Sequence, residues 1–304
     1  MFPKIQQRLV ILFAAVIGGL VWLTVVGPLR AEDGSPGLSL FFARSTPMLA
    51  MVLAVVAGIP ALALAVATAV RGNPLSGVFA WAGALCFLAA TGGNIEGWVH
   101  RSTNLPGDYG YLIGELFVWF AVLIVCLAGI QKLRAPLRNR FALLRYDAHL
   151  GSDMKIAIPD STSMMSGLIC AVVGGVGCFF LLRDFDTGQV MWSLGLAFAI
   201  GGLVAHLCVP NNNPVPILVS PILVAVAGYA WVIKDHNTAN AFREAWNSGE
   251  LPGMALALPI HYASAAVAGG ALGIGWGQAL MGPKKNKATE AEQPKATDDA
   301  KQAS

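Results

Sequence analysis

The sequence predicts an all-α integral membrane protein with eight transmembrane helices, arranged as two parallel four-helix repeats with pseudo-twofold symmetry along the membrane normal. Composition, the length of the apolar runs and recurring short motifs predict this fold. Of the 304 residues, 56% are apolar and only 12% are charged, whereas about a quarter of residues are charged in soluble domains. The mean hydropathy of +0.63 indicates the same class.

Eight apolar runs are long enough to cross a bilayer, which requires about 20 residues for roughly 30 Å of hydrocarbon. The first run, from Leu9 to Val26, is too long for the core of a signal peptide and no Ala-x-Ala site follows it, so we expect an uncleaved anchor. The predicted spans cover residues 9–27, 47–70, 75–93, 109–130, 165–182, 190–209, 215–233 and 255–281.

Basic residues gather in alternate loops of this arrangement. Because Lys and Arg collect on the cytoplasmic side of a membrane, their distribution predicts a multi-pass plasma (inner) membrane protein with both termini in the cytoplasm. The opposite loops carry a more balanced set of charges. The basic residues are Lys4, Arg8, Arg71, Lys132, Arg134, Arg138, Arg140, Arg145, Lys155, Lys284, Lys285 and Lys287.

Four short motifs of the first half return in the same order in the second half. They predict a first repeat over residues 1–130 and a second over 165–282, with an axis along the membrane normal because each repeat has an even number of spans. The alternative is chance, since Ala, Val and Gly are common in membrane helices. The pairs are Ala15–Gly19 with Ala171–Gly175, Leu53-Ala54 and Gly58 with Leu196-Ala197 and Gly201, Asn73-Pro74 with Asn213-Pro214, and Leu105–Gly107 with Leu251–Gly253.

Ordinary structural roles explain several of these motifs. Asn before Pro predicts a helix start, and paired glycines such as Gly201-Gly202 and Gly269-Gly270 predict close helix contacts in lipid. Pro60, Pro221 and Pro259 are expected to kink their spans. All five cysteines lie in apolar runs and are interpreted as small apolar residues.

Three segments lie outside the spans. The basic linker, residues 131–164, is predicted to attract anionic lipid, with a short amphipathic helix around Phe141 and Tyr146; alternatively, it only sets the orientation. Residues 237–249 predict an interfacial helix on the outer side, with Trp98 as its counterpart in the first half. The tail, residues 283–304, lacks large apolar residues and is predicted to be a disordered cytoplasmic segment.

The two Leu-Pro-Gly motifs each precede an ionisable residue by the same distance. Glu115 and His261 stand ten residues beyond the Leu of their motifs, about 9 Å inside the outer boundary at 1.5 Å per residue. Ionisable groups inside spans are candidate functional residues, because burial in lipid is costly. The predicted binding residues are Glu115, His261, Tyr111, Tyr262 and His206.

Other interpretations of these residues remain open. Glu115 is alternatively a solvated or hydrogen-bonded carboxylate and His261 a satisfied bundle histidine. We expect no cofactor and no metal, since His206 and His261 lie at opposite depths, which disfavours bis-histidine haem. An outer-loop site built from Glu96, His100, Asp184 and Asp186 is a further alternative.

The sequence favours a permease or channel for a small solute or ion, with a pathway between the two repeats. The alternative is a non-catalytic structural or assembly subunit of a membrane protein complex, and a third hypothesis, a lipid-modifying enzyme, lacks an adequate catalytic set. The expected partners are the lipid bilayer and either other membrane proteins or further copies of the chain. We expect no nucleic acid partner.

Overall fold

The computed structural model describes residues 2–30, 37–102, 105–140 and 156–281, and all regular secondary structure in these ranges is helical. The first half contains α1 (Phe2–Leu23), α2 (Val26–Leu29), α3 (Pro47–Arg71), α4 (Pro74–Gly92), α5 (Ile95–Arg101) and α6 (Tyr109–Arg140). The second half contains α7 (Ser161–Leu181), α8 (Thr187–Cys208), α9 (Val215–Val219), α10 (Pro221–Asp235), α11 (Ala239–Ser248), the 3₁₀ turn η2 (Gly253–Ala255), α12 (Pro259–His261), the π-helical turn η3 (Tyr262–Ala266) and α13 (Val267–Met281).

Seven helical segments in the described ranges are long and apolar enough to cross a membrane: α1, α3, α4, α6, α7, α8 and the α9–α10 pair. The prediction of an all-α, multi-pass protein is therefore confirmed. The predicted eighth span, residues 255–281, is not confirmed as a single helix. Pro259 begins α12, a five-residue π turn follows, and the remaining regular helix, α13, is only 15 residues long.

The predicted helix starts at the two Asn-Pro pairs are confirmed, since α4 begins at Pro74 and α9 begins at Val215. The Ser76 amide donates to the Asn73 side chain at 2.9 Å, and the Val215 amide donates to the Asn213 side chain at 3.2 Å. The prolines behave in three ways. Pro60 lies inside α3, Pro221 starts α10 directly after α9, and Pro259 starts α12, so the expected kink inside the last span is instead a helix start.

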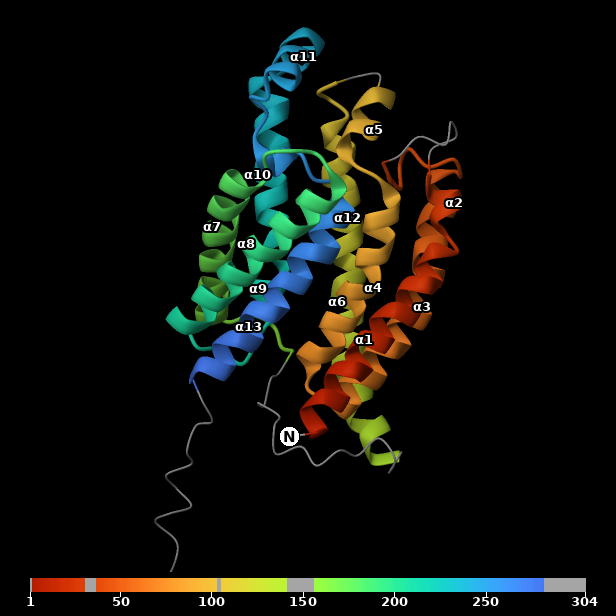
Figure 1. Ribbon diagram of the computed structural model, residues 1–304, viewed down its shortest axis with the longest axis vertical. Helices are drawn as coiled ribbons and strands as arrows, with labels where there is room; N and C mark the ends of the chain where they lie inside the picture. Colours follow the sequence, from red (N-terminus) through yellow and green to blue (C-terminus); the bar gives the residue numbers. More distant parts are fainter. Residues whose placement is uncertain (1, 31–36, 103–104, 141–155, 282–304) are drawn as a thin grey trace, which may run out of the picture.

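The helices form two groups that stand side by side (Figure 1). One contains α1, α3, α4 and α6, and the other contains α7, α8, α9–α10 and α13. The N-terminal end of α1 and the C-terminal end of α13 lie at the same end of the molecule, and α5 and α11 lie at the opposite end. The predicted helix at residues 237–249 is confirmed as α11, and Trp98 lies in α5.

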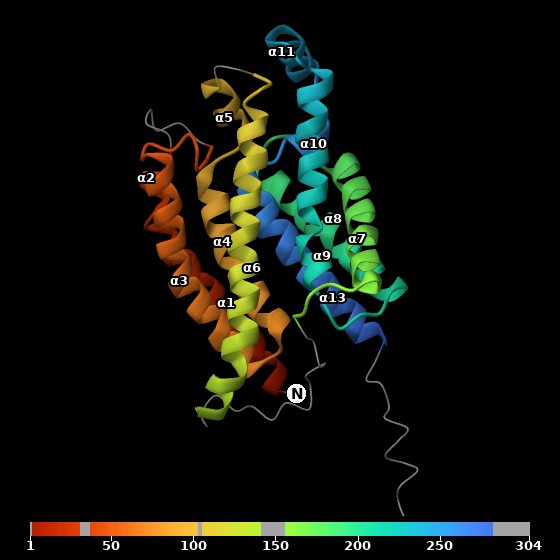
Figure 2. The same ribbon diagram turned by 180° about the vertical axis from the view of Figure 1, so that it is seen from behind.

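Two contact regions join the halves. In one, α4 packs against α13 and η3; in the other, α6 packs against α10 and α12. Figure 2 shows α10 running alongside the part of α6 nearer to α5. Glycines bring backbones close within the second half: a Cβ added to Gly202 would lie 2.8 Å from the Gly270 carbonyl. The prediction that these glycines serve close packing is thus confirmed.

α6 continues to Arg140 and α7 begins at Ser161, so helices extend into both ends of the predicted linker, residues 131–164. The Asp160 side chain accepts the Ser163 amide at 3.0 Å and so caps the start of α7. The amphipathic segment predicted around Phe141 and Tyr146 lies outside the described residues, as does the tail at 283–304.

Candidate functional site

Glu115 is fully buried in α6, where its carboxylate accepts three hydrogen bonds. Oε2 accepts the Ser39 hydroxyl at 2.7 Å and the Leu40 amide at 2.9 Å, and Oε1 accepts the Trp119 indole N–H at 3.3 Å. Trp119 lies one turn further along α6, whereas Ser39 and Leu40 belong to the segment that precedes α3. The carboxylate therefore ties this segment, residues 37–45, to α6.

A second set of contacts holds the same segment against the end of α4. The Gly37 and Leu38 amides donate to the Gly92 carbonyl at 2.7 and 2.9 Å, and the Arg101 guanidinium donates to the Gly37 carbonyl. Gly37 has a φ of 109°, which a residue with a side chain rarely adopts. Segment 37–45 is thus fixed at both its start and its middle, and Glu115 is one of its anchors.

His261 is fully buried at the end of α12, and only one of its ring nitrogens has a partner. Nδ1 accepts the Leu258 amide at 3.1 Å. Nε2 makes no hydrogen bond with the described part of the chain, although the carbonyl groups of Ala89 and Gly93 lie near the ring. Because Nδ1 accepts an N–H, the neutral ring must carry its proton on Nε2. The buried Nε2 donor of His261 therefore has no well-formed hydrogen bond within the described residues, and its nearby acceptors are the Ala89 and Gly93 carbonyls.

Three buried tyrosines surround the segment that leads to His261. The hydroxyls of Tyr262, Tyr109 and Tyr229 donate to the carbonyls of Met254 at 2.6 Å, Ala255 at 3.4 Å and Ala257 at 2.5 Å, respectively. Tyr109 belongs to α6 in the first half, whereas Tyr229 and Tyr262 belong to the second half. Residues 254–257 are therefore held by hydrogen bonds from both halves.

Ring contacts extend this tyrosine cluster, defined as Tyr109, Tyr229 and Tyr262. The Tyr109 ring centroid lies 5.7 Å from that of Tyr229, which in turn lies 6.4 Å from that of Tyr262. Trp98 of α5 and Phe242 of α11 contact Tyr109 at 5.2 and 5.9 Å. The end of the bundle near α5 and α11 is therefore closed by aromatic side chains from both halves.

Glu115 and His261 are not joined directly by a hydrogen bond within the described ranges. Glu115 accepts from the first half, and His261 accepts the Leu258 amide of the second half and also lies near Ala89 and Gly93 of the first. Tyr229 connects Glu115 and His261 indirectly. Its ring contacts that of Tyr262, the residue next to His261, and Tyr229 also interacts electrostatically with Glu115. Direct sharing of a proton between Glu115 and His261, as their matched positions suggested, remains a prediction.

The other predicted residues take different places. Tyr111 is 52% exposed and contacts the rings of Phe41 and Phe42, so it lies outside the buried tyrosine cluster. His206 is buried near the end of α8, where it packs beside Gly277 of α13. Gly277 is 16 residues beyond His261, or about 24 Å along a helix, and His206 is thus remote from the site.

Ser39 and Tyr229 are not among the residues predicted from the sequence. Ser39 had no local signal, because it lies between spans and meets Glu115 across 76 positions of sequence. Tyr229 had a weak sequence signal, because it is the only tyrosine in the predicted span 215–233. A polar side chain in an apolar span is a sign of an internal partner.

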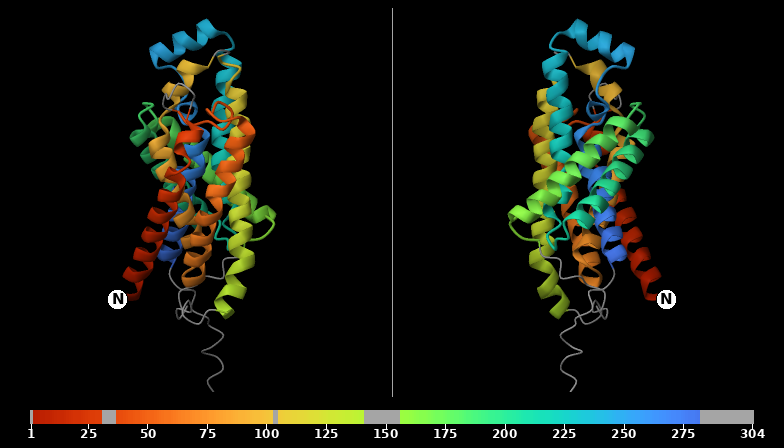
Figure 3. Two further views of the ribbon diagram at one scale, coloured as in Figure 1. Left: turned by 90° about the vertical axis from the view of Figure 1, so that its right-hand side faces the viewer. Right: turned by 90° about the vertical axis from the view of Figure 1, so that its left-hand side faces the viewer.

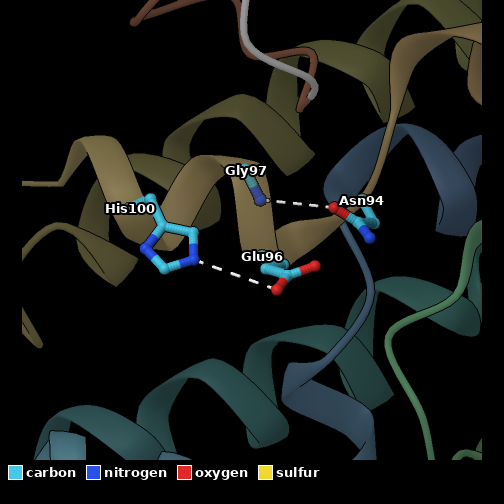
Figure 4. Close-up of polar contacts among 4 residues, drawn as sticks. All are labelled: Asn94, Glu96, Gly97 and His100. Atoms are coloured by element: carbon cyan, nitrogen blue, oxygen red, sulfur yellow. Dashed lines mark hydrogen bonds and ion pairs between the residues drawn. The ribbon is translucent and has the colours of Figure 1, made fainter.

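The acidic residues of the alternative loop site have local partners. Figure 4 shows Glu96 and His100 one turn apart on α5, 3.9 Å between the carboxylate and Nε2. Asp184 accepts the Phe185 amide at 2.7 Å, and Asp186 caps α8 by accepting the Gln189 amide at 3.1 Å. Among the described residues, no cluster of three or more His, Cys, Asp and Glu side chains is able to hold a metal ion.

No protein-family model, curated protein or solved structure matches this chain.

Proposed function

We propose that the protein is a permease or channel for a small solute or ion, with a pathway between the two halves beside His261 and Glu115. The observation that carries this proposal is the His261 ring, fully buried with an unpartnered Nε2 donor. Leaving a buried donor unsatisfied costs about 1 to 3 kcal/mol. Such a group is retained where a water molecule, an ion or a solute supplies the missing acceptor during the working cycle.

The helix around His261 supports the same proposal. The π turn η3 begins directly after His261, and single π turns inside α-helices occur frequently at functional sites. The Ser264 hydroxyl, inside this turn, donates to the Ile260 carbonyl at 2.7 Å. Interrupted helices that expose backbone groups near the centre of the bundle form the binding sites of many transporters.

The proposal includes an eighth crossing by the column α12–η3–α13. With eight crossings both termini lie on one side, in agreement with the positions of α1 and α13 in Figure 1, and the bias of Lys and Arg assigns that side to the cytoplasm of a plasma (inner) membrane. The contacts between the halves support the repeat. In the predicted repeat α4 corresponds to α10 and α6 corresponds to α13, so a twofold axis would exchange the α4–α13 contact with the α10–α6 contact, and both contacts are present.

The tyrosine cluster then closes the pathway at the end near α5 and α11. Its three hydroxyls hold residues 254–257 against both halves. Movement of this segment away from the hydroxyls would open a route to Nε2 of His261. Glu115 keeps the opposite wall in place by anchoring segment 37–45.

A second candidate is a non-catalytic subunit of a membrane complex. It is favoured by the direct contact between the halves, where the Tyr109 hydroxyl of one donates to the Ala255 carbonyl of the other. In this case the tyrosine cluster is a permanent contact between the two halves. His261 then serves only to cap the start of α12 through the Leu258 amide.

Flux measurements on purified protein in liposomes separate the two candidates. The assays are osmotic swelling with a panel of small neutral and ionic solutes, and proton movement reported by a trapped pH dye. We expect flux in the wild type, loss of flux in His261→Asn, and retention in the control His206→Asn. Unchanged flux in both His261→Asn and Glu115→Gln contradicts the pathway. If every solute crosses at the rate measured in liposomes without protein, and a partner protein co-purifies in a fixed stoichiometry, the subunit is favoured.

A further inference from the structure

A separate hollow of about 390 Å³ lies between the first turns of α1 and the last turn of α3, at the end of the bundle opposite the tyrosine cluster. Figure 3 shows the N-terminal turns of α1 leaning away from the neighbouring helices at this end. We call this hollow the α1–α3 groove. It shares no residue with the site around His261.

The walls of the groove differ along its length. Leu9, Val10 and Phe13 form an apolar wall, and Leu9 and Phe13 are 47% and 64% exposed. Gln7 and Arg71 line the groove at its polar end. An apolar groove that ends at amide and guanidinium donors matches the two parts of a phospholipid, its acyl chains and its phosphate.

The depth of Arg71 fits a lipid headgroup. Arg71 is the last residue of α3, a helix of 25 residues and therefore about 37 Å long. Since the hydrocarbon layer is about 30 Å thick, the end of α3 reaches the headgroup region while the apolar wall, further along the groove, faces the acyl chains. A lipid is thus able to use both ends of the groove at once.

The charges around the groove favour an anionic headgroup. Arg71 makes no hydrogen bond or ion pair within the described part of the chain, and none of the described side chains that line the groove is acidic. The Arg134 guanidinium donates to the Gly72 carbonyl at 3.0 Å, which brings a second positive charge to the residue next to Arg71. Arg8 is exposed on the neighbouring turn of α1.

We propose that the α1–α3 groove binds one anionic phospholipid, with the phosphate on Arg71 and Gln7 and the acyl chains along Leu9, Val10 and Phe13. This site is distinct from the basic linker, where the sequence predicts a diffuse attraction to anionic lipid. Here a single lipid has a defined place between two helices, independent of any transport by the protein.

Native mass spectrometry of the full chain tests the proposal. The protein is released from micelles that contain equal amounts of phosphatidylglycerol and phosphatidylcholine. We expect one dominant phosphatidylglycerol adduct in the wild type. Arg71→Gln should reduce the preference for phosphatidylglycerol about fivefold, since it removes one basic residue at the membrane surface. Arg243→Gln, on the exposed face of α11 at the other end, is the matched control and should keep the preference.

A second variant tests the apolar part of the groove. Val10→Trp fills the space beside Phe13, and we expect it to remove adducts of both lipids while the thermal unfolding midpoint stays unchanged. Equal adducts of the two lipids in the wild type would overturn the proposal. So would an undiminished preference in Arg71→Gln, which would place the anionic lipid elsewhere. Release of the adduct by millimolar glycerol phosphate would indicate a site for free phosphate instead.

Discussion

Glu115 and His261 occupy equivalent positions after the two Leu-Pro-Gly motifs, yet their surroundings differ in one decisive respect. The Glu115 carboxylate accepts three hydrogen bonds inside a continuous 32-residue helix. The His261 ring has one partner and one unpartnered nitrogen, at a point where the helix is interrupted by a π turn.

This difference separates two uses of a buried ionisable group. A carboxylate whose oxygens all accept hydrogen bonds holds structure, because two of its donors come from segment 37–45 and tie that segment to α6. A donor without an acceptor weakens the fold and is therefore a candidate for binding. The comparison consequently assigns anchoring to Glu115 and puts the proposed solute contact at His261.

The largest effect on stability is expected from Glu115→Ala. The change leaves the Ser39 hydroxyl, the Leu40 amide and the Trp119 indole without their acceptor, and we expect a loss of about 2 to 4 kcal/mol in the free energy of unfolding. Equilibrium unfolding in detergent micelles measures it. Glu115→Gln keeps an acceptor oxygen and should lose about half as much. A stability equal to wild type for Glu115→Ala would show that Glu115 is no anchor.

The tyrosine cluster provides the next largest effect. Tyr229→Phe removes the donor to the Ala257 carbonyl and should cost about 1 kcal/mol in unfolding free energy. Tyr111→Phe is the matched control, because Tyr111 is exposed and a phenylalanine keeps its ring contacts. We expect the control to unfold like the wild type. Equal effects of the two substitutions would refute the assignment of a locking role to Tyr229.

At His261 we expect a small effect on stability and a large effect on flux. His261→Asn retains an acceptor for the Leu258 amide, so its unfolding free energy should stay within about 1 kcal/mol of the wild type. His261→Ala removes that acceptor and should be about 1 to 2 kcal/mol less stable than His261→Asn. The same unfolding assay compares the two variants. If alanine is as stable as asparagine, the ring does not cap α12.

The smallest effect concerns Asp160, an exposed carboxylate that contrasts with the buried Glu115. Hydrogen bonds from the Ser163 side chain and amide hold the pKa of Asp160 below its ordinary range. A lowered folded-state pKa contributes stability above the unfolded-state pKa, and this contribution is lost as the pH falls through the folded-state value. Asp160→Asn still caps α7, but its thermal unfolding midpoint should fall less steeply with decreasing pH in this acidic range than the midpoint of the wild type. An identical fall of the midpoint in both proteins would contradict the prediction.

The sequence predicted most of the helices and placed Glu115 and His261 inside spans, but it left open whether Glu115 is solvated. Long apolar runs identify spans directly, since backbone groups in lipid must find their partners within the same helix. The last span was predicted as one helix, although Pro259 and the π turn divide it. Which turn becomes π-helical depends on how residues 259–266 pack against α4 and α8, and periodicity alone carries no such information.

What the sequence by itself determined is the membrane class, the helical content, the helix starts at Asn73-Pro74 and Asn213-Pro214, and the equal placement of Glu115 and His261. These features depend on short segments and on the chemistry of lipid. Only the tertiary structure decided that Ser39 and Leu40 donate to Glu115, that Tyr229 interacts with both Glu115 and the Tyr262 ring, and that Nε2 of His261 makes no hydrogen bond within the described residues. Hydrogen bonds between residues distant in sequence depend on which helices become neighbours, and that is settled by packing across the whole bundle.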